Sequence, residues 1–283
     1  MTGTAIISAL AIWAAGWFIN ARLANSAAAN TRLVRLLVPA IFGLTLLIMW
    51  ELLVRLLEVS PIILPPPTMI ADRFANEIPT LWADFVQTIV KGAMTGYIIG
   101  MLAAFGVAIL ADRSDFLTRG ILPVGGFMAA LPIVGIAPIF VRWLGSDWQS
   151  KAAVVAVMVF FPILVNTVAG LRDTTAMQRD LMRTYGAGYW PTLFKLRLPA
   201  AMPFIFNGLK IATTLALIGA IVAEFFGSPT VGMGFRISTS VGRLALDMVW
   251  AEIVVAALAG SAFYGLMAWI EGRVTFWHPS QRK

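Results

Sequence analysis

The chain has no cysteine and a single histidine, His278. The absence of cysteine excludes disulfide bonds, thiolate nucleophiles and zinc sites with sulfur ligands. One histidine in a polar tail argues against a histidine-based metal centre or a catalytic triad. The H-E-x-x-H and G-x-S-x-G patterns of metalloproteases and hydrolases are also missing. We therefore predict no metal, no cofactor and no enzymatic activity.

Charged residues are scarce, at 12% of the 283 positions, whereas soluble domains contain roughly 25%. Hydrophobic residues make up 59% of the chain, and the mean hydropathy is +0.85. Several apolar runs approach the ~20 residues that a helix needs to cross a membrane. The sequence therefore predicts an all-α polytopic membrane protein. The expected spans are 2–21, 36–57, 92–111, 120–141, 152–171, 203–226 and 248–270.

The first of these runs, 2–21, differs from a cleaved signal peptide. No basic residue precedes its apolar part, and the first one, Arg22, follows it, whereas a cleaved signal carries its positive charge in front. We predict an extra first span and a cytoplasmic linker at 1–35, a six-span core at 36–275 and a cytoplasmic tail at 276–283. The alternative for the first run is an interfacial segment, because alanine-rich runs insert weakly.

The net charge of +7 would suggest nucleic acid as a partner of a soluble protein. In a membrane protein, basic loops on the cytoplasmic side explain it better, because they face anionic lipid headgroups. Placing the long loop 172–199 inside puts more Lys and Arg residues inside than outside. We therefore expect contact with membrane lipid and no nucleic acid.

Two local patterns predict structure near the expected spans. Glu51 and Arg55 lie four apart, so they can pair on one helix face. Prolines at 61 and 65–67 force extended backbone, after which Thr68 is expected to cap a short amphipathic helix ending near Asn76. In the next span, glycines at 92, 96 and 100 share one face, where another helix can approach closely.

The stretch 180–203 is a polar, basic segment between two apolar runs, and its pattern predicts two short helices separated by a turn. It resembles the cytoplasmic loop of ABC importer permeases, which has the pattern E-A-A-x3-G-x9-I-x-L-P. Asp180 stands at the acidic position, while Leu181 and Met182 replace the alanines. Gly186 is the glycine, Leu196 the aliphatic position, and Leu198 and Pro199 close the pattern. Gly186 is expected to allow the sharp turn between the two short helices, and Pro199 to end the second.

Further motifs support the same resemblance, which covers roughly residues 60 to 275. The permeases for sulfonates, taurine, nitrate and vitamin precursors have passages similar to LPPPT at 64–68, LPIVGIAPIFVRWLG at 131–145 and FFPILVNTVAGLR at 160–172. The glycine-rich segment 227–236, predicted to be an outside loop, contains the similar motif G-x-G-F at 232–235. The pattern T-L-x-R-x-x-x-G is met by Thr88, Lys91 and Gly96, with the glycine one residue late.

The resemblance implies a type I ABC importer permease with a six-helix core in the inner membrane of a bacterium. The implied partners are two ATP-binding subunits, a second permease copy forming a homodimer, and an extracytoplasmic solute-binding protein. ATP would be hydrolysed on the separate subunits. The residues expected to contact an ATP-binding subunit through this coupling loop (172–199) are Asp180, Gly186, Leu196, Leu198 and Pro199.

The expected residues of the pathway or its outer mouth fall in the proline-rich span, the motif positions and the outer loop. They are Lys91, Pro132, Pro138, Asn166, Glu224, Gly232 and Gly234. For Lys91 the favoured interpretation is an interfacial lysine that snorkels. Glu224 is either a hydrogen-bonding group at the outer mouth or a structural partner for backbone amides, and the sequence favours neither.

The sequence gives little information about the identity of the solute. Few basic residues lie along the expected pathway, which favours a neutral heterocyclic vitamin or precursor of the riboflavin or thiamine pyrimidine type. Sulfonate, taurine or nitrate is the alternative. A stand-alone secondary transporter would need ionisable residues deep in its spans, and only Lys210 comes close to that position.

Overall fold

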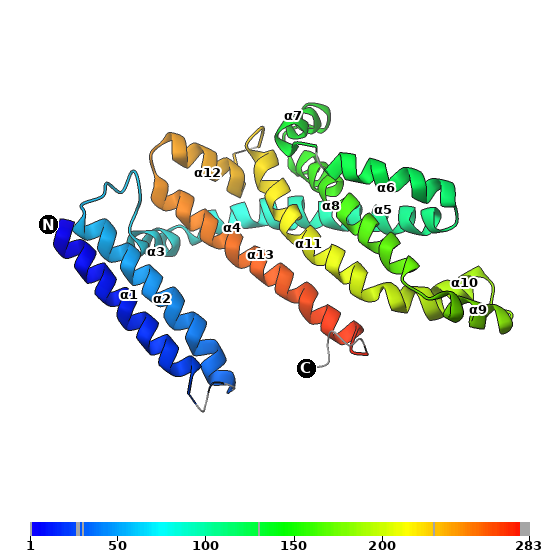
Figure 1. Cartoon of the computed structure of the whole chain (residues 1–283). Helices are drawn as coiled ribbons and strands as arrows, with labels where there is room; N and C mark the ends of the chain where they lie inside the picture. Colours follow the sequence, from blue (N-terminus) through cyan, green and yellow to red (C-terminus); the bar gives the residue numbers. More distant parts are fainter. Residues whose placement is uncertain (1, 27–28, 30, 130, 229, 278–283) are drawn as a thin grey trace. The chain divides into compact units, whose positions relative to one another are not determined.

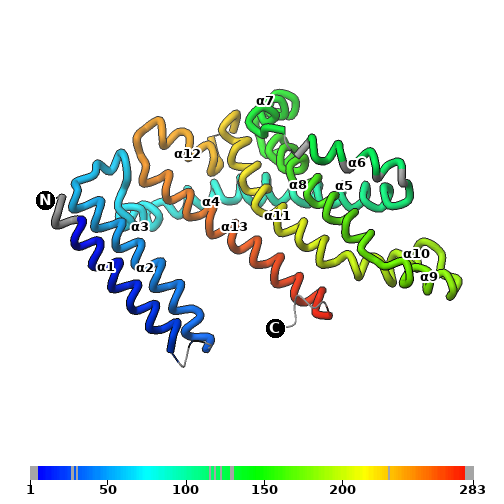
Figure 2. The backbone as a smooth tube through the Cα atoms, in the orientation of Figure 1, coloured from blue at the N-terminus to red at the C-terminus, as the bar shows by residue number. Residues whose placement is uncertain are grey.

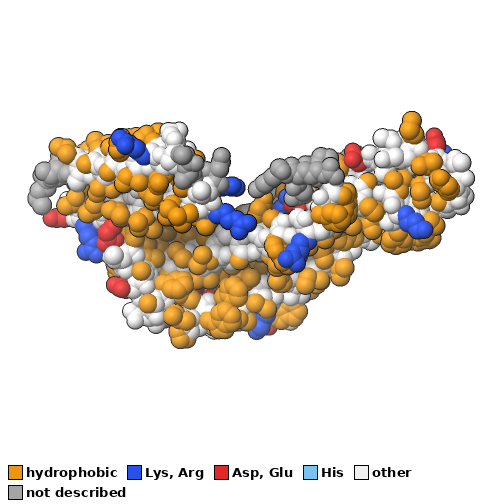
Figure 3. Space-filling model, turned by 90° about the horizontal axis from the view of Figure 1, so that it is seen from below, with side chains coloured by type: hydrophobic (Ala, Val, Ile, Leu, Met, Phe, Trp, Pro, Cys, Tyr) orange, Lys and Arg blue, Asp and Glu red, His pale blue; other side chains and the backbone are white. Residues whose placement is uncertain are grey.

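The computed structural model describes residues 2–277 except 27, 28, 30, 130 and 229, so the tail at 278–283, His278 included, lies outside the described residues. The described part of the chain is helical and contains no strand, which confirms the predicted all-α fold. Within it, six helices are long and apolar enough to cross a membrane: Ile6–Ala24, Arg32–Leu56, Ile78–Asp112, Trp148–Arg172, Tyr189–Glu224 and Leu246–Val274. Hydrophobic side chains also cover most of the face shown in Figure 3.

The chain divides into two units, one formed by residues 1–78 and 239–252 and the other by 79–238 and 253–283. The helices of the first unit are α1 (Thr2–Ala24), α2 (Arg32–Leu56) and α3 (Pro67–Asn76). It also contains the end of α12 (Met233–Gly242) and the start of α13 (Leu246–Val274).

In the first unit, α1 and α2 pair side by side (Figure 1). Gly16 permits this contact, because a Cβ atom there would lie 2.7 Å from Cγ2 of Thr45. Thr31 begins α2 as its N-cap, with its hydroxyl accepting a hydrogen bond from the Val34 N–H at 3.4 Å. The indole ring of Trp50 on α2 lies edge-on to that of Trp250, with centroids 4.8 Å apart.

The predicted pair of Glu51 and Arg55 is present, but it has an additional partner in Thr68. Glu51 accepts hydrogen bonds from the Thr68 N–H at 3.0 Å and from the Thr68 hydroxyl at 2.8 Å. The predicted short helix is confirmed as α3, but Thr68 is not its cap. The helix begins at Pro67 after Pro66, because a proline fits the first helical turn, where its missing N–H costs nothing.

The second unit contains the remaining helices. They are α4 (Ile78–Phe85), the π-helical stretch η1 (Val86–Met94), α5 (Thr95–Asp112), α6 (Asp115–Ala129), α7 (Ile133–Leu144), α8 (Trp148–Arg172), α9 (Ala176–Thr184), α10 (Tyr189–Thr192), the π-helical stretch η2 (Leu193–Arg197) and α11 (Leu198–Glu224). The core lies where α8 packs between α5 and α11 (Figures 1 and 2).

Glycines set the spacing of these core helices. A Cβ atom at Gly96 of α5 would lie 2.6 Å from Cβ of Val155 on α8, and one at Gly100 would lie 2.6 Å from the Ala156 carbonyl oxygen. The predicted close approach at the glycine stripe is therefore confirmed, with α8 as the partner helix. On the other side of α8, a Cβ atom at Gly208 of α11 would lie 2.9 Å from Cβ of Asn166.

The predicted continuous span 120–141 is wrong. The structure has two shorter helices there, α6 and α7, and Pro132 is the N-cap of the second with extended backbone (ψ 115°). A proline cannot donate the helical hydrogen bond, and its ring disfavours helical backbone in the preceding residue. Both effects break the helix before Pro132, whereas Pro123 and Pro138 are accommodated inside α6 and α7.

The predicted start of the preceding span is also wrong, because the helix begins at Ile78 rather than near 92 and continues to Asp112. Polar residues such as Asp84 and Thr88 made the first turns resemble an external segment. In the structure these side chains are fully buried against other elements of the same unit, so tertiary packing extends the helix beyond the apolar run.

Candidate functional site

The coupling loop (172–199) begins with α9, whose first turn is held by a capping box. The Thr175 hydroxyl accepts a hydrogen bond from the Gln178 N–H at 3.3 Å, and the Gln178 side chain accepts one from the Thr175 N–H at 2.9 Å. This reciprocal pair satisfies amides that a helix start leaves without partners. The short helix is thus defined by its own sequence.

The turn after α9 depends on Gly186. Its φ of +68° lies in the left-handed region that favours glycine. The Gly186 N–H donates to the Arg183 carbonyl at 2.8 Å, and the Ala187 N–H donates to the Met182 carbonyl at 3.0 Å. These two bonds form a Schellman motif, so the predicted sharp turn at Gly186 is confirmed.

One face of α9 exposes apolar side chains. Met177, Leu181 and Tyr185 recur every four residues and are 82%, 56% and 80% exposed. Asp180 is also exposed and pairs with Arg183 at 3.4 Å. Spacing of four places the apolar side chains on one stripe, which is an unusual arrangement for a polar loop in contact with water alone.

The loop is tied to the core by a group we name the clasp: Asp112, Tyr189 and Arg197. The Arg197 guanidinium pairs with both carboxylate oxygens of Asp112 and donates from Nε to the Leu171 carbonyl at 3.0 Å. The Tyr189 hydroxyl donates to the same carboxylate at 2.9 Å. Only 15% and 3% of the Arg197 and Asp112 side chains are exposed, so the clasp joins the ends of α5 and α8 to the loop.

A cation–π contact reinforces the clasp. The Arg113 guanidinium lies 4.6 Å from the ring centroid of Tyr189 and 4.5 Å from that of Trp190. Sequence reasoning missed all of these partners. The available signal was an acidic residue, Asp112, at the end of an uncharged span that precedes a basic loop.

The predicted end of the second short helix at Pro199 is wrong. The helix continues from α10 through η2 into α11, so residues 189–224 form one element (Figure 2). Pro199 lies in the first turn of α11, directly after the π-helical stretch, where the backbone hydrogen-bond pattern already changes and its missing N–H is tolerated. Leu196, Leu198 and Pro199 are partly buried.

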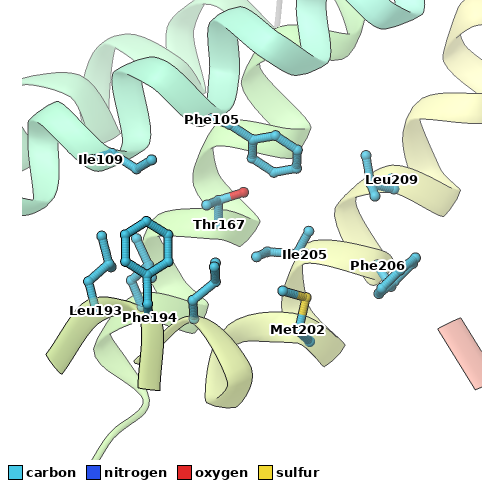
Figure 4. A pocket seen from close by; sticks show the side chains of 11 residues that line it. Phe105, Ile109, Thr167, Leu193, Phe194, Met202, Ile205, Phe206 and Leu209 are labelled. Atoms are coloured by element: carbon cyan, nitrogen blue, oxygen red, sulfur yellow. The ribbon is translucent and has the colours of Figure 1, made fainter. Parts of the chain in front are cut away.

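An apolar cavity of about 370 Å³ lies between the coupling loop and the helices α5, α8 and α11 (Figure 4). Phe105 and Ile109 of α5, Leu193 and Phe194 of the loop, and Ile205 of α11 contribute to its wall. Thr167 supplies a hydroxyl to the lining, but this group already donates to the Ile163 carbonyl at 2.7 Å. Such a lining does not suit a polar solute, which would lose its hydrogen bonds with water there.

A second cluster, which we name the clamp, holds the glycine-rich segment 227–236. It consists of Asp84, Thr88, Glu224, Gly232 and Gly234. The Glu224 carboxylate accepts hydrogen bonds from the Thr88 hydroxyl at 2.8 and 2.9 Å and from the Gly234 N–H at 2.7 Å. Asp84 accepts one from the Gly232 N–H at 2.6 Å. The carboxylates are thus buried and paired with backbone amides.

The clamp also explains both glycines and the position of the next helix. A Cβ atom at Gly232, whose φ is +131°, would lie 2.6 Å from Oε1 of Glu224, and one at Gly234 would lie 2.8 Å from the Glu224 Cβ. The Thr88 hydroxyl accepts the Met233 N–H at 2.7 Å, and Asp84 binds the Arg236 Nε at 2.7 Å. The segment predicted as a loop to residue 236 therefore becomes helical at Met233.

The π-helical stretch η1 carries Thr88 of the clamp and the exposed Lys91. In this stretch the backbone bonds residue i to i+5 instead of i+4, and Gly96 follows two residues after its end. Nearby, Asp147 caps α8. The Trp148 N–H and, less strongly, the Gln87 amide hold the pKa of the Asp147 carboxyl below its usual value.

The other predicted pathway residues lie apart from the clamp. Asn166 donates to the Pro162 carbonyl at 2.8 Å and accepts from the Asn207 amide at 3.0 Å. Pro132 and Pro138 are exposed. Lys210, the ionisable residue that the sequence placed nearest to a deep position in a span, forms an ion pair with Glu271 at 2.6 Å. In the part of the chain that the structure describes, no group of acidic or histidine side chains could hold a metal ion.

Comparison with known proteins identifies the family of this chain. Residues 96–276 match the family described as the binding-protein-dependent transport system inner membrane component. The formylaminopyrimidine transport permease protein of Halalkalibacterium halodurans is 28% identical over 243 residues, which cover 86% of this chain and 96% of the relative. The riboflavin transport system permease protein of Chloroflexus aurantiacus is 28% identical over 237 residues, 83% of this chain and 88% of the relative.

A putative aliphatic sulfonates transport permease protein of Bacillus subtilis is similar to the same extent, with 28% identity over 247 residues that cover 87% of each chain. These relatives are permeases, membrane components rather than enzymes, and the family works with ATP-binding subunits and a binding protein. The predicted inner-membrane location is confirmed. The chain belongs to the family of binding-protein-dependent transport system inner membrane components and is the permease subunit of an ABC importer for a small solute.

Proposed function

We propose that the coupling loop lies in the cytoplasm and receives an ATP-binding subunit on α9. The observation that carries this proposal is the stripe of Met177, Leu181 and Tyr185, which is apolar and more than half exposed. A groove on the partner would cover the stripe, as an amphipathic helix docks by residues at four-residue spacing. Asp180 and Arg183 would lie at the polar rim of the contact.

The clasp suggests how displacement of the loop reaches the membrane. Arg197 holds the ends of α5 and α8 through Asp112 and the Leu171 carbonyl, so a movement of α9 would be carried to all three core helices together. ATP binding would draw two such loops towards each other, and the permeases would then change the side to which their pathway opens. Two ATP-binding subunits, a second copy of this chain in a homodimer and an external solute-binding protein complete the proposed assembly.

For the solute, we favour a heterocyclic vitamin or precursor of the riboflavin or formylaminopyrimidine kind. Two relatives of this chain are named for such solutes. Within the core helices, Lys210 pairs with Glu271 and Lys151 donates to the Ser146 carbonyl, whereas Lys91 is exposed. Few basic side chains are therefore available to an anion. A sulfonate remains the alternative, because an equally similar relative is named for aliphatic sulfonates.

The experiment is affinity purification of the tagged chain from solubilised native membranes, followed by mass spectrometry. We expect an ATP-binding subunit to co-purify with the wild type and with Gly188→Ala, which alters an exposed glycine with an ordinary φ of −70°. Asp180→Asn should weaken recovery and Leu181→Asp should abolish it. The co-purified binding protein is then screened against flavins, pyrimidines and sulfonates. A chain that purifies alone and moves solute into liposomes without ATP would instead be a secondary transporter.

A further inference from the structure

The outward face of α11 carries two polar residues between apolar ones, within an apolar helix that is long enough to cross a membrane. Its exposed residues Asn207, Ile211, Thr214 and Ile218 are spaced by four, three and four positions, so they form one stripe along the helix. The opposite face packs on α8, where Gly208 and Gly219 permit close contact. We name these four exposed positions the α11 stripe.

A neighbouring core helix provides the contrast. Between residues 98 and 110, every exposed position of α5 is apolar or glycine. These positions are Ile98, Ile99, Leu102, Ala103, Gly106 and Leu110. Such a surface suits contact with lipid chains, which offer no hydrogen bonds. The α11 stripe breaks this rule at Asn207 and Thr214, although it belongs to the same core.

The geometry of Asn207 shows capacity for a further partner. Its side-chain nitrogen donates to Oδ1 of Asn166 at 3.0 Å, and the Asn166 nitrogen donates in turn to the Pro162 carbonyl at 2.8 Å. The Asn207 carboxamide oxygen accepts no hydrogen bond from the described residues. These two hydrogen bonds fix the orientation of both side-chain amides. The exposed Asn207 oxygen, which has no partner among the described residues, is thereby directed to the outside of the subunit.

An open carboxamide cannot face hydrocarbon without cost, because a polar group there loses its hydrogen bonds with water and gains none in return. Asn207 lies ten residues beyond Arg197 of the clasp, about 15 Å along the helix at a rise of 1.5 Å per residue. Asn is too short to snorkel over that distance, so the headgroup region next to the clasp does not supply its partner. Water or a polar solute is the partner that removes the cost.

We propose that the α11 stripe lines the solute pathway and that Asn207, oriented by Asn166, hydrogen-bonds the passing solute. This inference rests on the proposed function, since it presumes a pathway formed beside α11. The α11 stripe contains no charged side chain, so it recognises the solute by hydrogen bonds rather than by opposite charge. It therefore fits polar, uncharged groups of a solute, such as the amide and ring nitrogen groups of a heterocycle.

The absence of cysteine makes the test direct. Single cysteines are introduced as Asn207→Cys, Thr214→Cys and, as a matched control, Leu102→Cys, whose native side chain is 61% exposed on α5. Gly100 and Gly219 both contact α8 between Val155 and Val159, so the control matches the depth of the Thr214 end of the stripe, whereas Gly208 beside Asn207 contacts α8 at Pro162 to Asn166. Each variant is co-purified with its ATP-binding subunit, reconstituted in vesicles and treated with a charged, water-soluble methanethiosulfonate reagent.

We expect the cysteines at 207 and 214 to react at least tenfold faster than the cysteine at 102, because the reagent attacks thiolates in water. Equal rates at all three positions would overturn the inference, as would disulfide linkage of two copies through position 207 without reagent, which would make the stripe a contact between copies. Testing both 207 and 214 guards against one variant that fails to assemble. If no variant and no wild type brings down an ATP-binding subunit, the proposed function fails instead.

Discussion

At the scale of single residues, one φ angle determines how the coupling loop turns. Gly186 adopts +68°, and the space around it is open, so a methyl group there would meet no neighbouring atom. Any penalty for a side chain at this position therefore comes from the backbone. Gly188 offers a matched comparison two residues later, because it is also in open space but has a φ of −70°.

Gly186→Ala should destabilise the Schellman turn by about 1 kcal/mol, the cost of holding a residue with a Cβ in the left-handed region. Hydrogen exchange of the Gly186–Ala187 amides should then become about fivefold faster, since their bonds to Arg183 and Met182 open more often. Gly188→Ala should leave exchange unchanged. Equal protection in both variants would show that strain at Gly186 does not control the turn.

Thr88 is a second residue whose single hydroxyl has a large structural role. It donates to Glu224 and accepts the buried Met233 N–H at 2.7 Å. Thr88→Val keeps the shape but leaves the Met233 N–H without a partner and removes a hydrogen bond from Glu224, which keeps that of the Gly234 N–H, at a cost of about 1 to 3 kcal/mol. We expect a lower thermal unfolding midpoint in detergent and faster tryptic cleavage after Arg236, because the glycine-rich segment is released.

The control for this experiment is Thr213→Val. Thr213 is as fully buried as Thr88, but its hydroxyl only donates to the Lys210 carbonyl of its own helix, so its loss leaves no new unpaired amide. If Thr88→Val and Thr213→Val changed the unfolding midpoint and the cleavage after Arg236 to the same extent, the clamp would not be what holds the glycine-rich segment.

At the scale of elements, the clasp is the feature that joins the coupling loop to the core. Arg197→Gln should destabilise the chain by about 3 kcal/mol, because it leaves the buried Asp112 carboxylate unpaired. Arg183→Gln breaks an exposed pair with Asp180 and should cost less than about 1 kcal/mol. Thermal unfolding of the purified chain measures both.

The clasp also predicts a functional effect. In the reconstituted importer, Arg197→Gln should reduce solute uptake more than ATP hydrolysis, because the ATP-binding subunit still docks on α9 while its movement reaches the core helices less completely. A variant that loses both activities in the same proportion would assign the clasp a purely structural role.

The sequence predicted the elements better than their contacts. The apolar runs, the glycine spacing of α5 and the turn at Gly186 depend on local pattern, and the structure shows them. The pair of Asp112 and Arg197 joins residues 85 positions apart, and no local pattern says which helices face each other. The break at Pro132 has a local cause, the proline itself. The composition of the segment 120–141 alone does not distinguish a kinked span from two helices.

At the scale of the whole chain, α1 stands outside the part that matches the family, which begins at residue 96. It packs on α2 through Gly16 and Thr45. We predict that a chain shortened by residues 1–26 still co-purifies with the ATP-binding subunit in the same amount, because the coupling loop belongs to the other unit. The measurement is quantitative mass spectrometry of the purified complex, and recovery below half of the wild-type value would assign α1 a part in assembly.

The uninterrupted helix from Tyr189 to Glu224 has a mechanical consequence. Its 36 residues correspond to a rod of about 54 Å at a rise of 1.5 Å per residue. The clasp grips one end through Tyr189 and Arg197, and the clamp grips the other through Glu224. Half of this rod is about 27 Å long. A tilt of about 5° around its midpoint therefore moves the two ends by roughly 2 Å in opposite directions. A push at the ATP-driven end would therefore arrive at the glycine-rich segment as an equal and opposite stroke.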